Sequence, residues 1–255
     1  MYDIITFGGA TLDIFMKDKE FEISEVTNDL KKLCLAFGDK IIVDDVHFTN
    51  GGGGMNTATS FAQLGFKTSF LGAIGDDEIG DSIKAKLKKK NISSDLLQTI
   101  KDAKSGLSVA MHAGERERTL LLFRGANDDL RPEQVPWEKL SQTKWIYLSH
   151  LSGKSDASLS RLADFIEQND IKLAWNPGST QLKKGLPHLE KLLKKTTILN
   201  INKEEAELLS GITVARNKNL SQDEIDDMTP VFEKLAKVGP KIIVITDGKK
   251  GAAVF

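Results

Sequence analysis

Cysteine is nearly absent from the sequence, since Cys34 is the only one among 255 residues. No disulfide can therefore form within the chain, which is typical of proteins that fold in a reducing compartment, and we expect a cytoplasmic protein. Long apolar runs are absent too, because none approaches the ~18 residues of a membrane-spanning helix. The N-terminal residues lack a basic and apolar leader, so the sequence predicts neither secretion nor a membrane partner.

Net charge is also small. Lys and Arg number 35 and Asp and Glu number 36, which gives a net charge of −1. A chain with this balance has no global field to attract nucleic acid, so we expect no nucleic-acid partner. The four histidines are scattered without metal-ligand spacing, and the chain has no Gly-x-Ser-x-Gly sequence. The sequence therefore favours neither a histidine-bound metal nor a serine nucleophile.

Short apolar runs alternate with amphipathic stretches along the chain. We expect strands at 3–7, 67–74, 145–148, 172–175, 197–201 and 241–246, and helices at 55–64, 77–90, 155–168, 203–209 and 223–238. Because parallel strands need long crossovers, this alternation predicts an α/β fold with a mostly parallel sheet covered by helices on both faces. The length suits one domain of this kind.

Two segments break the alternation. Residues 13–48 hold strand-like pieces without a helical crossover, and residues 105–125 read as a hairpin that turns at Gly114-Glu115-Arg116. We expect these β-rich insertions to form a small second sheet that covers a cleft as a lid. The edge of such a lid can pair with the lid of a second copy, which would make a homodimer.

The first motif is Gly8-Gly9-Ala10-Thr11-Leu12-Asp13, directly after the first predicted strand. Ligands of open α/β sheets bind beyond the carboxyl ends of the strands, so Asp13 is placed to accept hydrogen bonds from substrate hydroxyls. The alternative is a turn in which Asp13 caps nearby backbone. The glycine spacing does not match the G-x-G-x-x-G dinucleotide fingerprint, which argues against an NAD-dependent oxidoreductase.

The glycine run Gly51-Gly52-Gly53-Gly54 precedes Asn56 and a predicted helix. Glycine loses more backbone freedom on folding than other residues, so such a run indicates close approach of something to the backbone. Free N–H groups at the helix start can face a ligand, and Asn56 offers donors and acceptors to a hydroxylated molecule. The alternative is a helix entry capped by Asn56. No Gly-Lys-Ser/Thr follows, so this is not a P-loop.

Two motifs end later strands. Asn202 and Glu205 match a capping box, and they also suit a Mg²⁺ ion held through its waters. Thr246 and Gly248 suit close approach by nucleotide phosphates, or else Asp247-Gly248 forms a hairpin turn. The acidic run after Gly75, which opens the predicted helix at 77, reads as structural because it complements the helix dipole.

In this order the motifs resemble the ribokinase-like sugar kinases, the phosphofructokinase-B family, over nearly the whole chain. The matching segments are Gly51-Gly52-Gly53-Gly54-Met55-Asn56-Thr57-Ala58, Leu64-Gly65, Leu71-Gly72-Ala73-Ile74-Gly75-Asp76-Asp77-Glu78-Ile79-Gly80, Gly125-Ala126-Asn127, Asn176-Pro177, Asn202-x-x-Glu205-Ala206 with Leu208-Leu209 and Gly211, and Thr246-x-Gly248 with Gly251. The resemblance implies a three-layer α/β/α domain spanning 1–255, with a small β lid from about 13–48 and 105–125.

The same resemblance implies an ATP-dependent kinase that phosphorylates a hydroxyl of a sugar or nucleoside. Substrate would contact Asp13, Gly52, Gly53 and Asn56. Mg²⁺ and its water shell would be organised by Asn202 and Glu205, with Glu205 facing the metal through water, and ATP would contact Thr246 and Gly248.

One family feature is not found. The family's Gly-Ala-Gly-Asp segment, which supplies the catalytic base and an anion hole, occurs nowhere in these 255 residues. The resemblance places that aspartate beyond Phe255, so we name no catalytic residue in this chain. We therefore expect the chain, C-terminally incomplete against the family pattern, to be inactive or nearly so.

A non-catalytic sugar-binding or regulatory protein is the alternative. The retained Asn202, Glu205, Thr246 and Gly248 count against it, because a protein that only binds sugar does not need them. The motifs do not identify the sugar or nucleoside.

Overall fold

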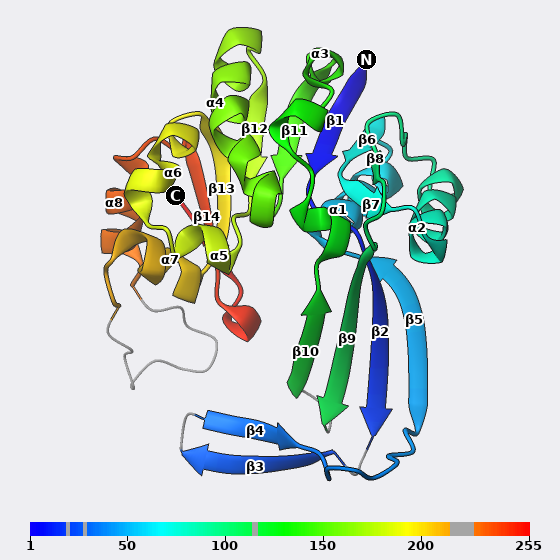
Figure 1. The fold of residues 1–255 in the computed structure, drawn as a ribbon. Helices are drawn as coiled ribbons and strands as arrows, with labels where there is room; N and C mark the ends of the chain where they lie inside the picture. The colour runs from blue at the N-terminus through cyan, green and yellow to red at the C-terminus, as the bar shows by residue number, and fades with distance from the viewer. Residues whose placement is uncertain (19–20, 28–29, 114–116, 215–226) are drawn as a thin grey trace.

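The computed structural model describes residues 1–18, 21–27, 30–113, 117–214 and 227–255 (Figure 1). Its centre is a sheet with the strand order β15-β14-β13-β12-β11-β1-β6. The strands are β1 (Tyr2–Phe7), β6 (Thr68–Leu71), β11 (Thr143–Leu148), β12 (Lys172–Trp175), β13 (Thr196–Asn202), β14 (Ile242–Thr246) and β15 (Ala252–Val254). Neighbours are parallel except β15, which runs antiparallel to β14. This confirms the predicted α/β fold with a mostly parallel sheet.

Helices pack against this sheet and, in the case of α2, against strands beside it. The helices are α1 (Gly53–Gln63), α2 (Glu78–Lys89), α3 (Trp137–Leu140), α4 (Ser158–Asn169), α5 (Ser179–Leu182), α6 (Leu186–Leu193), α7 (Lys203–Ser210) and α8 (Thr229–Ala236). Helix α1 contacts β1 and β6, and α7 and α8 contact β14. None of the helices in the described ranges is long and apolar enough to cross a membrane.

Several boundaries differ from the sequence prediction. The strand expected at 67–74 is broken at Gly72 into β6 and β7 (Ala73–Gly75), and β7 leaves the main sheet to pair with β8 (Gln98–Ile100). A Cβ at Gly72 would lie 2.6 Å from the Gly8 carbonyl oxygen, so the chain bends where only glycine fits. The helix expected at 155–168 begins as a 3₁₀ turn over Gly153–Ala157. The first residues of the helix expected at 223–238 lie outside the described residues.

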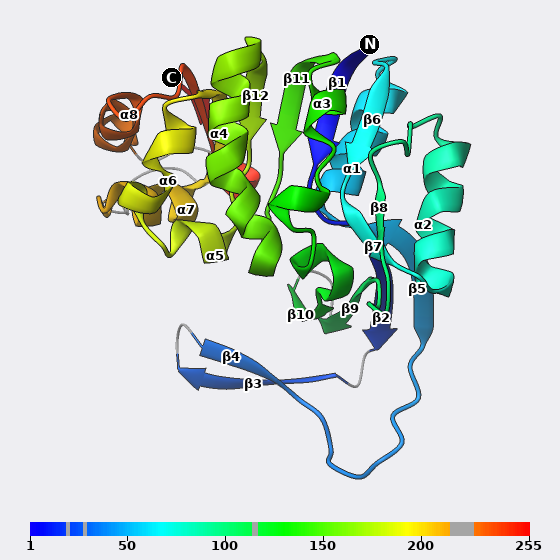
Figure 2. The same ribbon diagram turned by 45° about the horizontal axis from the view of Figure 1, so that its top comes forward.

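A second sheet extends from the carboxyl edge of the main one (Figure 1). It has the order β10-β9-β2-β5 and consists of β2 (Thr11–Asp18), β5 (Asp45–Gly51), β9 (Gly106–Ala113) and β10 (Glu117–Phe123). A hairpin of β3 (Glu22–Thr27) and β4 (Leu30–Cys34) lies beyond it (Figure 2). We call the four-stranded unit the small sheet. The turn predicted at 114–116 lies outside the described residues, and the lid role stays a prediction.

Asp77 fastens the small sheet to the helical layer. It is the N-cap of α2 and accepts hydrogen bonds from the Gly80 N–H at 2.8 Å, the Ser105 N–H at 2.8 Å and the Ser105 hydroxyl at 2.6 Å. Burial raises the pKa of this carboxyl, but the hydrogen bonds from Ser105 and Gly80 outweigh it and leave the pKa below its usual value. Because Ser105 directly precedes β9, these bonds join the start of that strand to α2. The N-cap role of Asp77 confirms the structural interpretation of the acidic run.

Gly54 marks a close contact of α1 with the residue that follows β1 and with Phe70 of β6. A Cβ at this position would lie 2.8 Å from the Gly8 carbonyl carbon and 2.8 Å from the Phe70 ring. We therefore expect Gly54→Ala to lower the free energy of unfolding by at least ~1 kcal/mol, although alanine favours helix by about that amount. Chemical denaturation measures the change. Ser60→Ala, on the exposed side of the same helix, should stay within ~0.5 kcal/mol of the parent, and equal stability of the two variants would contradict the packing argument.

Candidate functional site

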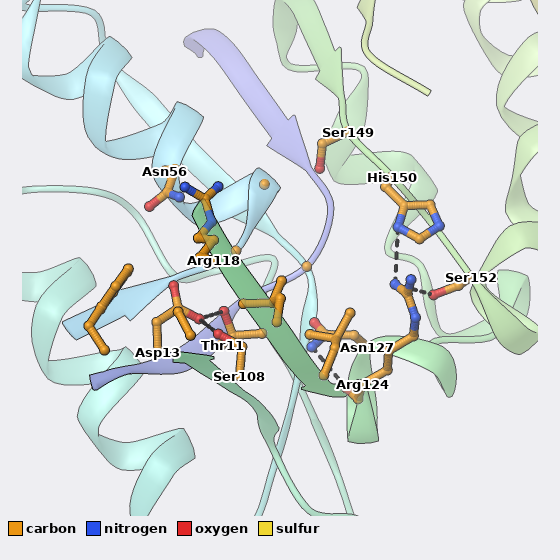
Figure 3. A pocket seen from close by; sticks show the side chains of 17 residues that line it. Thr11, Asp13, Asn56, Ser108, Arg118, Arg124, Asn127, Ser149, His150 and Ser152 are labelled. Carbon is orange, nitrogen blue, oxygen red and sulfur yellow. Dashed lines mark hydrogen bonds between the residues drawn. The ribbon is translucent and has the colours of Figure 1, made fainter. Parts of the chain in front are cut away.

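A cavity of about 480 Å³ lies between the small sheet and the carboxyl ends of β1 and β11 (Figure 3). The start of α1 forms part of its wall. Four residues singled out in the sequence line it, namely Asp13, Gly52, Gly53 and Asn56. Figure 3 shows Asp13 and Asn56 on one side of the cavity and Arg124, His150 and Ser152 on the other. We refer to this cavity as the main pocket.

Asp13 stands in β2 and points into the main pocket (Figure 3). Its Oδ1 accepts hydrogen bonds from the Thr11 hydroxyl at 2.7 Å and the Ser108 hydroxyl at 2.6 Å. The alternative, in which Asp13 caps a turn, is therefore wrong. A Cβ at Gly51 would lie 2.0 Å from Oδ2, so the first glycine of the run makes room for this carboxylate. Within the described part of the chain, Oδ2 has no hydrogen-bond donor and remains available to a ligand.

The next glycines bring α1 against the turn between β1 and β2. Gly52 has φ +93°, and a Cβ there would lie 2.6 Å from the Gly9 carbonyl oxygen. That oxygen accepts hydrogen bonds from the N–H groups of Gly54 at 3.1 Å and Met55 at 3.3 Å. Two of the helix-start donors expected to face a ligand are thus used within the protein. The backbone left beside the pocket is that of Gly52 and Gly53.

Asn56 lies in the first turn of α1, whose N-cap is Gly52, with no side-chain capping bond. The capping alternative for Asn56 is therefore wrong. Its side chain is exposed and lines the main pocket. An amide in this position can both donate to and accept from hydroxyl groups.

The far wall of the pocket was missed by the sequence analysis. Arg124 Nη1 lies 3.0 Å from His150 Nδ1 and donates to the Ser152 hydroxyl at 3.1 Å, and His150 Nε2 lies 2.6 Å from the Thr180 hydroxyl. Burial, then the Arg124 charge, lower the pKa of His150 to about 4, against the raising effect of Asp128 and Asp156. The imidazole is therefore neutral near pH 7. Because a guanidinium only donates, Nδ1 accepts and Nε2 carries the proton.

Asn127 joins the two walls. Its side chain accepts a hydrogen bond from the Ala10 N–H at 2.9 Å and donates to the Ala10 carbonyl at 2.8 Å and the Arg124 carbonyl at 3.0 Å. The sequence marked Gly125-Ala126-Asn127 as a family match without a role. The structure shows that Asn127 ties the end of β10 to the turn before β2, so the residues that follow β1 and β10 keep a fixed spacing.

The remaining predicted residues lie on the same edge of the main sheet but outside the pocket. Asn202 accepts from the Glu205 N–H at 2.8 Å, and Glu205 Oε2 accepts from the Asn202 N–H at 2.9 Å, which confirms the capping box. Asn202 is paired in register with Thr246 on β14. Strand β12 separates this group from β11, and the group contributes no residue to the lining of the main pocket.

The turn after Thr246 is open. Strands β14 and β15 form the hairpin that Asp247-Gly248 predicted. Gly248 has φ +54° and Gly251 has φ +93°, and a Cβ at either position would meet nothing within 4 Å. Asp247 Oδ2 is buried and has no hydrogen-bond partner within the described residues. The backbone at Gly248 and Gly251 is open to close approach by a ligand.

Phe255, beyond which the resemblance places the family's catalytic aspartate, follows β15 and lies away from the main pocket. Its N–H donates to the Ile243 carbonyl at 3.0 Å, and its carbonyl accepts from the Ile243 N–H at 2.9 Å. Its ring stacks on Phe232 of α8 with the ring centroids 5.6 Å apart. Phe255 is thus held against β14 and α8 by structural contacts, and the place of a catalytic base beyond it stays a prediction.

Comparison with known proteins agrees with this arrangement. A family model described as pfkB family carbohydrate kinase matches residues 20–255. Ribokinase of Haemophilus influenzae is 26% identical over 219 residues, which cover 85% of this chain and 67% of that protein. Ribokinase of Staphylococcus aureus is 25% identical over 249 residues, which cover 97% of this chain and 73% of that protein.

A solved structure shows the same fold. Ribokinase of Arabidopsis thaliana, complexed with ribose and ATP, superposes with a TM-score of 0.78 at 20% identity and covers 100% of this chain and 74% of its own. The family model covers most of the chain, and the superposition agrees with the fold described above. The chain therefore belongs to the pfkB family of carbohydrate kinases, whose members are ATP-dependent phosphotransferases.

Proposed function

We propose that the main pocket binds a sugar or nucleoside and that a hydroxyl of this substrate receives the γ-phosphoryl group of ATP. The observation that carries the proposal is Asp13, whose Oδ1 is held by two protein hydroxyls while Oδ2 faces the pocket. A carboxylate fixed in this way accepts hydrogen bonds from substrate hydroxyls. Asn56 stands beside it with both donors and acceptors, and the backbone of Gly52 and Gly53 lets a sugar ring approach closely.

We propose that the group around Asn202 and Thr246 serves Mg²⁺ and ATP. One Glu205 oxygen is held by the Asn202 N–H, which leaves the other to accept a hydrogen bond from a metal-bound water. No cluster of three His, Cys, Asp or Glu side chains that could hold a metal ion is found among the described residues; Mg²⁺ commonly keeps most of its water ligands and binds through one or two carboxylates and substrate phosphates. The open backbone at Gly248 and the Thr246 hydroxyl would contact the nucleotide. Bound Mg²⁺-ATP supplies the phosphoryl group and neutralises its charge.

The small sheet forms the roof of the pocket through Phe15, Ala110, Leu120 and Leu122. We propose that it acts as a lid, because apolar side chains over a polar pocket exclude water from the transfer. A non-catalytic sugar-binding protein would need the pocket alone. The retained Asn202–Glu205 pair and the open Gly248 turn favour the kinase.

The first test is calorimetric titration with D-ribose, D-fructose and inosine. We expect at least one to bind, and Asp13→Asn to weaken that binding by roughly 10-fold or more, since a hydrogen bond to a charged group is worth about 1.5–3 kcal/mol. Asp81→Asn, on the exposed face of α2, is the matched control and should bind like the parent. No binding by the parent, or equal binding by Asp13→Asn, would contradict the proposal.

The rate of phosphoryl transfer is measured on the same protein samples. Because these 255 residues contain no Gly-Ala-Gly-Asp, we propose that they bind substrate and Mg²⁺-ATP but transfer phosphate slowly, since a positioned base is worth about 10²–10⁴ in rate. Rapid Mg²⁺-ATP-dependent phosphorylation by this chain would contradict the proposed slow transfer but not the proposed binding. A change in sugar affinity on adding ATP separates a kinase site from a simple sugar binder.

Glu205→Gln separates the capping role from the metal role. Glutamine preserves the capping box, so we expect the free energy of unfolding to stay within ~0.5 kcal/mol of the parent. The charge that orients a metal-bound water is lost, so the affinity for ATP in the presence of Mg²⁺ should fall roughly 10-fold. Glu204→Gln, exposed in the same helical turn, is the control. An equal effect of both changes would mean that Glu205 only caps α7.

We also propose that two copies associate through the small sheet. Phe48, Ile14, Val109 and Leu121 are paired across its strands and form an apolar row on the face away from the pocket. Phe48 is 61% exposed and Leu121 55% exposed, although apolar groups are usually covered.

Analytical ultracentrifugation tests this association. We expect the parent to sediment as a dimer and Leu121→Lys as a monomer. Leu208→Lys, at a position 50% exposed on α7, should sediment like the parent. A strict monomer at all concentrations would rule out pairing by this chain.

A further inference from the structure

Two arginines face a pocket whose other polar groups are suited to neutral hydroxyls. Arg118 comes from β10, and Arg124 follows the end of the same strand. In Figure 3 Arg118 lies on the side of Asp13 and Asn56, whereas Arg124 lies across the cavity beside His150. Recognition of hydroxyl groups needs no guanidinium, so these side chains require a separate explanation.

Arg124 is held in place by neutral groups. Both of its hydrogen bonds to side chains, to His150 and Ser152, use Nη1. Within the described residues its Nε and Nη2 have no acceptor, so the two parallel donors of that edge remain unused. The planar edge formed by Nε and Nη2 matches the two oxygens of a carboxylate or phosphate. Held at Nη1, the guanidinium is oriented before a ligand arrives.

The side chain of Arg118 has no hydrogen bond or ion pair with any described residue. Its side chain is exposed and belongs to the lining of the main pocket. Because it stands two strand positions from Leu120 and four from Leu122, it shares their pocket-facing side of β10. It therefore adds a second positive charge to the roof.

The described lining of the pocket holds two guanidinium groups and one carboxylate, that of Asp13. No carboxylate among the described residues lies within 4.0 Å of either guanidinium. The pocket's own carboxylate, Asp13, receives its hydrogen bonds from hydroxyl groups. Asp128 reaches Arg124 only through Ser152, and His150 is neutral near pH 7. Closing the small sheet over a neutral sugar would remove water from the Arg118 side chain and from the Nε–Nη2 edge of Arg124.

We infer that the sugar substrate of the main pocket carries an anionic group, a carboxylate or a phosphate, which Arg118 and Arg124 bind. This inference rests on the proposed function and narrows its substrate class. Asp13 and Asn56 hold hydroxyls at one side of the pocket, and the anionic group extends towards the Nε–Nη2 edge of Arg124 on the other. A cavity of about 480 Å³ has room for a monosaccharide with such a group.

Titration with matched pairs of sugars tests the inference without ATP, so that a role of the arginines on the transferred phosphoryl group does not interfere. The pairs are D-glucose with D-gluconate, D-ribose with D-ribose 5-phosphate, and D-fructose with D-fructose 6-phosphate. We expect the tightest ligand to be anionic and to bind at least ~10-fold more tightly than its neutral partner, and that preference should shrink as salt is raised. Preference for gluconate alone identifies a carboxylate, and preference for the phosphorylated sugars identifies a phosphate.

Arginine variants test which side chains cause the preference for the anionic sugar over its neutral partner. We expect Arg124→Met to bring the affinity ratio within the preferred pair close to one, and Arg118→Met to reduce it by a smaller factor. Arg124→Lys keeps the charge but loses the two-donor edge, so an intermediate ratio is expected. Arg131→Met, at an exposed position outside the pocket, is the control and should retain the parent ratio. Thermal unfolding of each variant checks that it is folded. If Arg124→Met does not fold, Arg124→Lys is used in its place.

Three results would overturn the inference. Neutral sugars that bind as tightly as their anionic partners would remove the need for an anionic group. Arginine variants that weaken neutral and anionic ligands equally would show that the arginines contact a part common to both. No binding by any sugar would overturn the proposed function and this inference with it. Neutral binding that still depends on Asp13 would leave the proposed function standing and overturn this inference alone.

Discussion

The close approach of two glycine-rich segments is the constraint on which the rest of the structure depends. The start of α1 lies against the turn between β1 and β2, where one carbonyl oxygen, that of Gly9, accepts the N–H groups of Gly54 and Met55. Side chains at Gly52 or Gly54 would collide with backbone within 3 Å. This contact joins the main sheet, the first helix and the small sheet at one point. The pocket forms there because the same glycine run also leaves space for Asp13.

Much of the fold was predictable because its strands are short apolar runs in a regular alternation with helices. The expected strand at 172–175 agrees with β12, since Leu173 and Trp175 must be buried on a central strand. Helices α5 and α6 were not predicted. They are short, and the glycine, proline and lysine residues between 178 and 188 interrupt the helical spacing of their apolar residues. The break at Gly72 was also missed, since it is caused by contact with Gly8, which is distant in the sequence.

The candidate site was predictable in part. The residues near the glycine run follow strands directly, so their place at the sheet edge could be inferred from order alone. The far wall depends on register. Arg118, Leu120, Leu122 and Arg124 are spaced by two, the period of one face of a strand, but the sequence does not say which face looks inward. The pairing of β9 with β2 decides this. For Asn202 and Glu205 the position could be predicted but the role could not. Their capping box accounts for both residues without any ligand.

The residues of the small sheet that shape the pocket are separate from the residues that form the large apolar core. The side chains that roof the pocket alternate along β10, an edge strand whose outer side pairs with no other strand in the described ranges. The large apolar core lies elsewhere, around β11, β12 and β13. Replacements along β10 can therefore alter the size, polarity and charge of the pocket while leaving the core intact. On a scaffold of this kind, substitution of a few residues in one edge strand is enough to change the substrate. Members of such a family can therefore evolve new substrates while they keep the same fold.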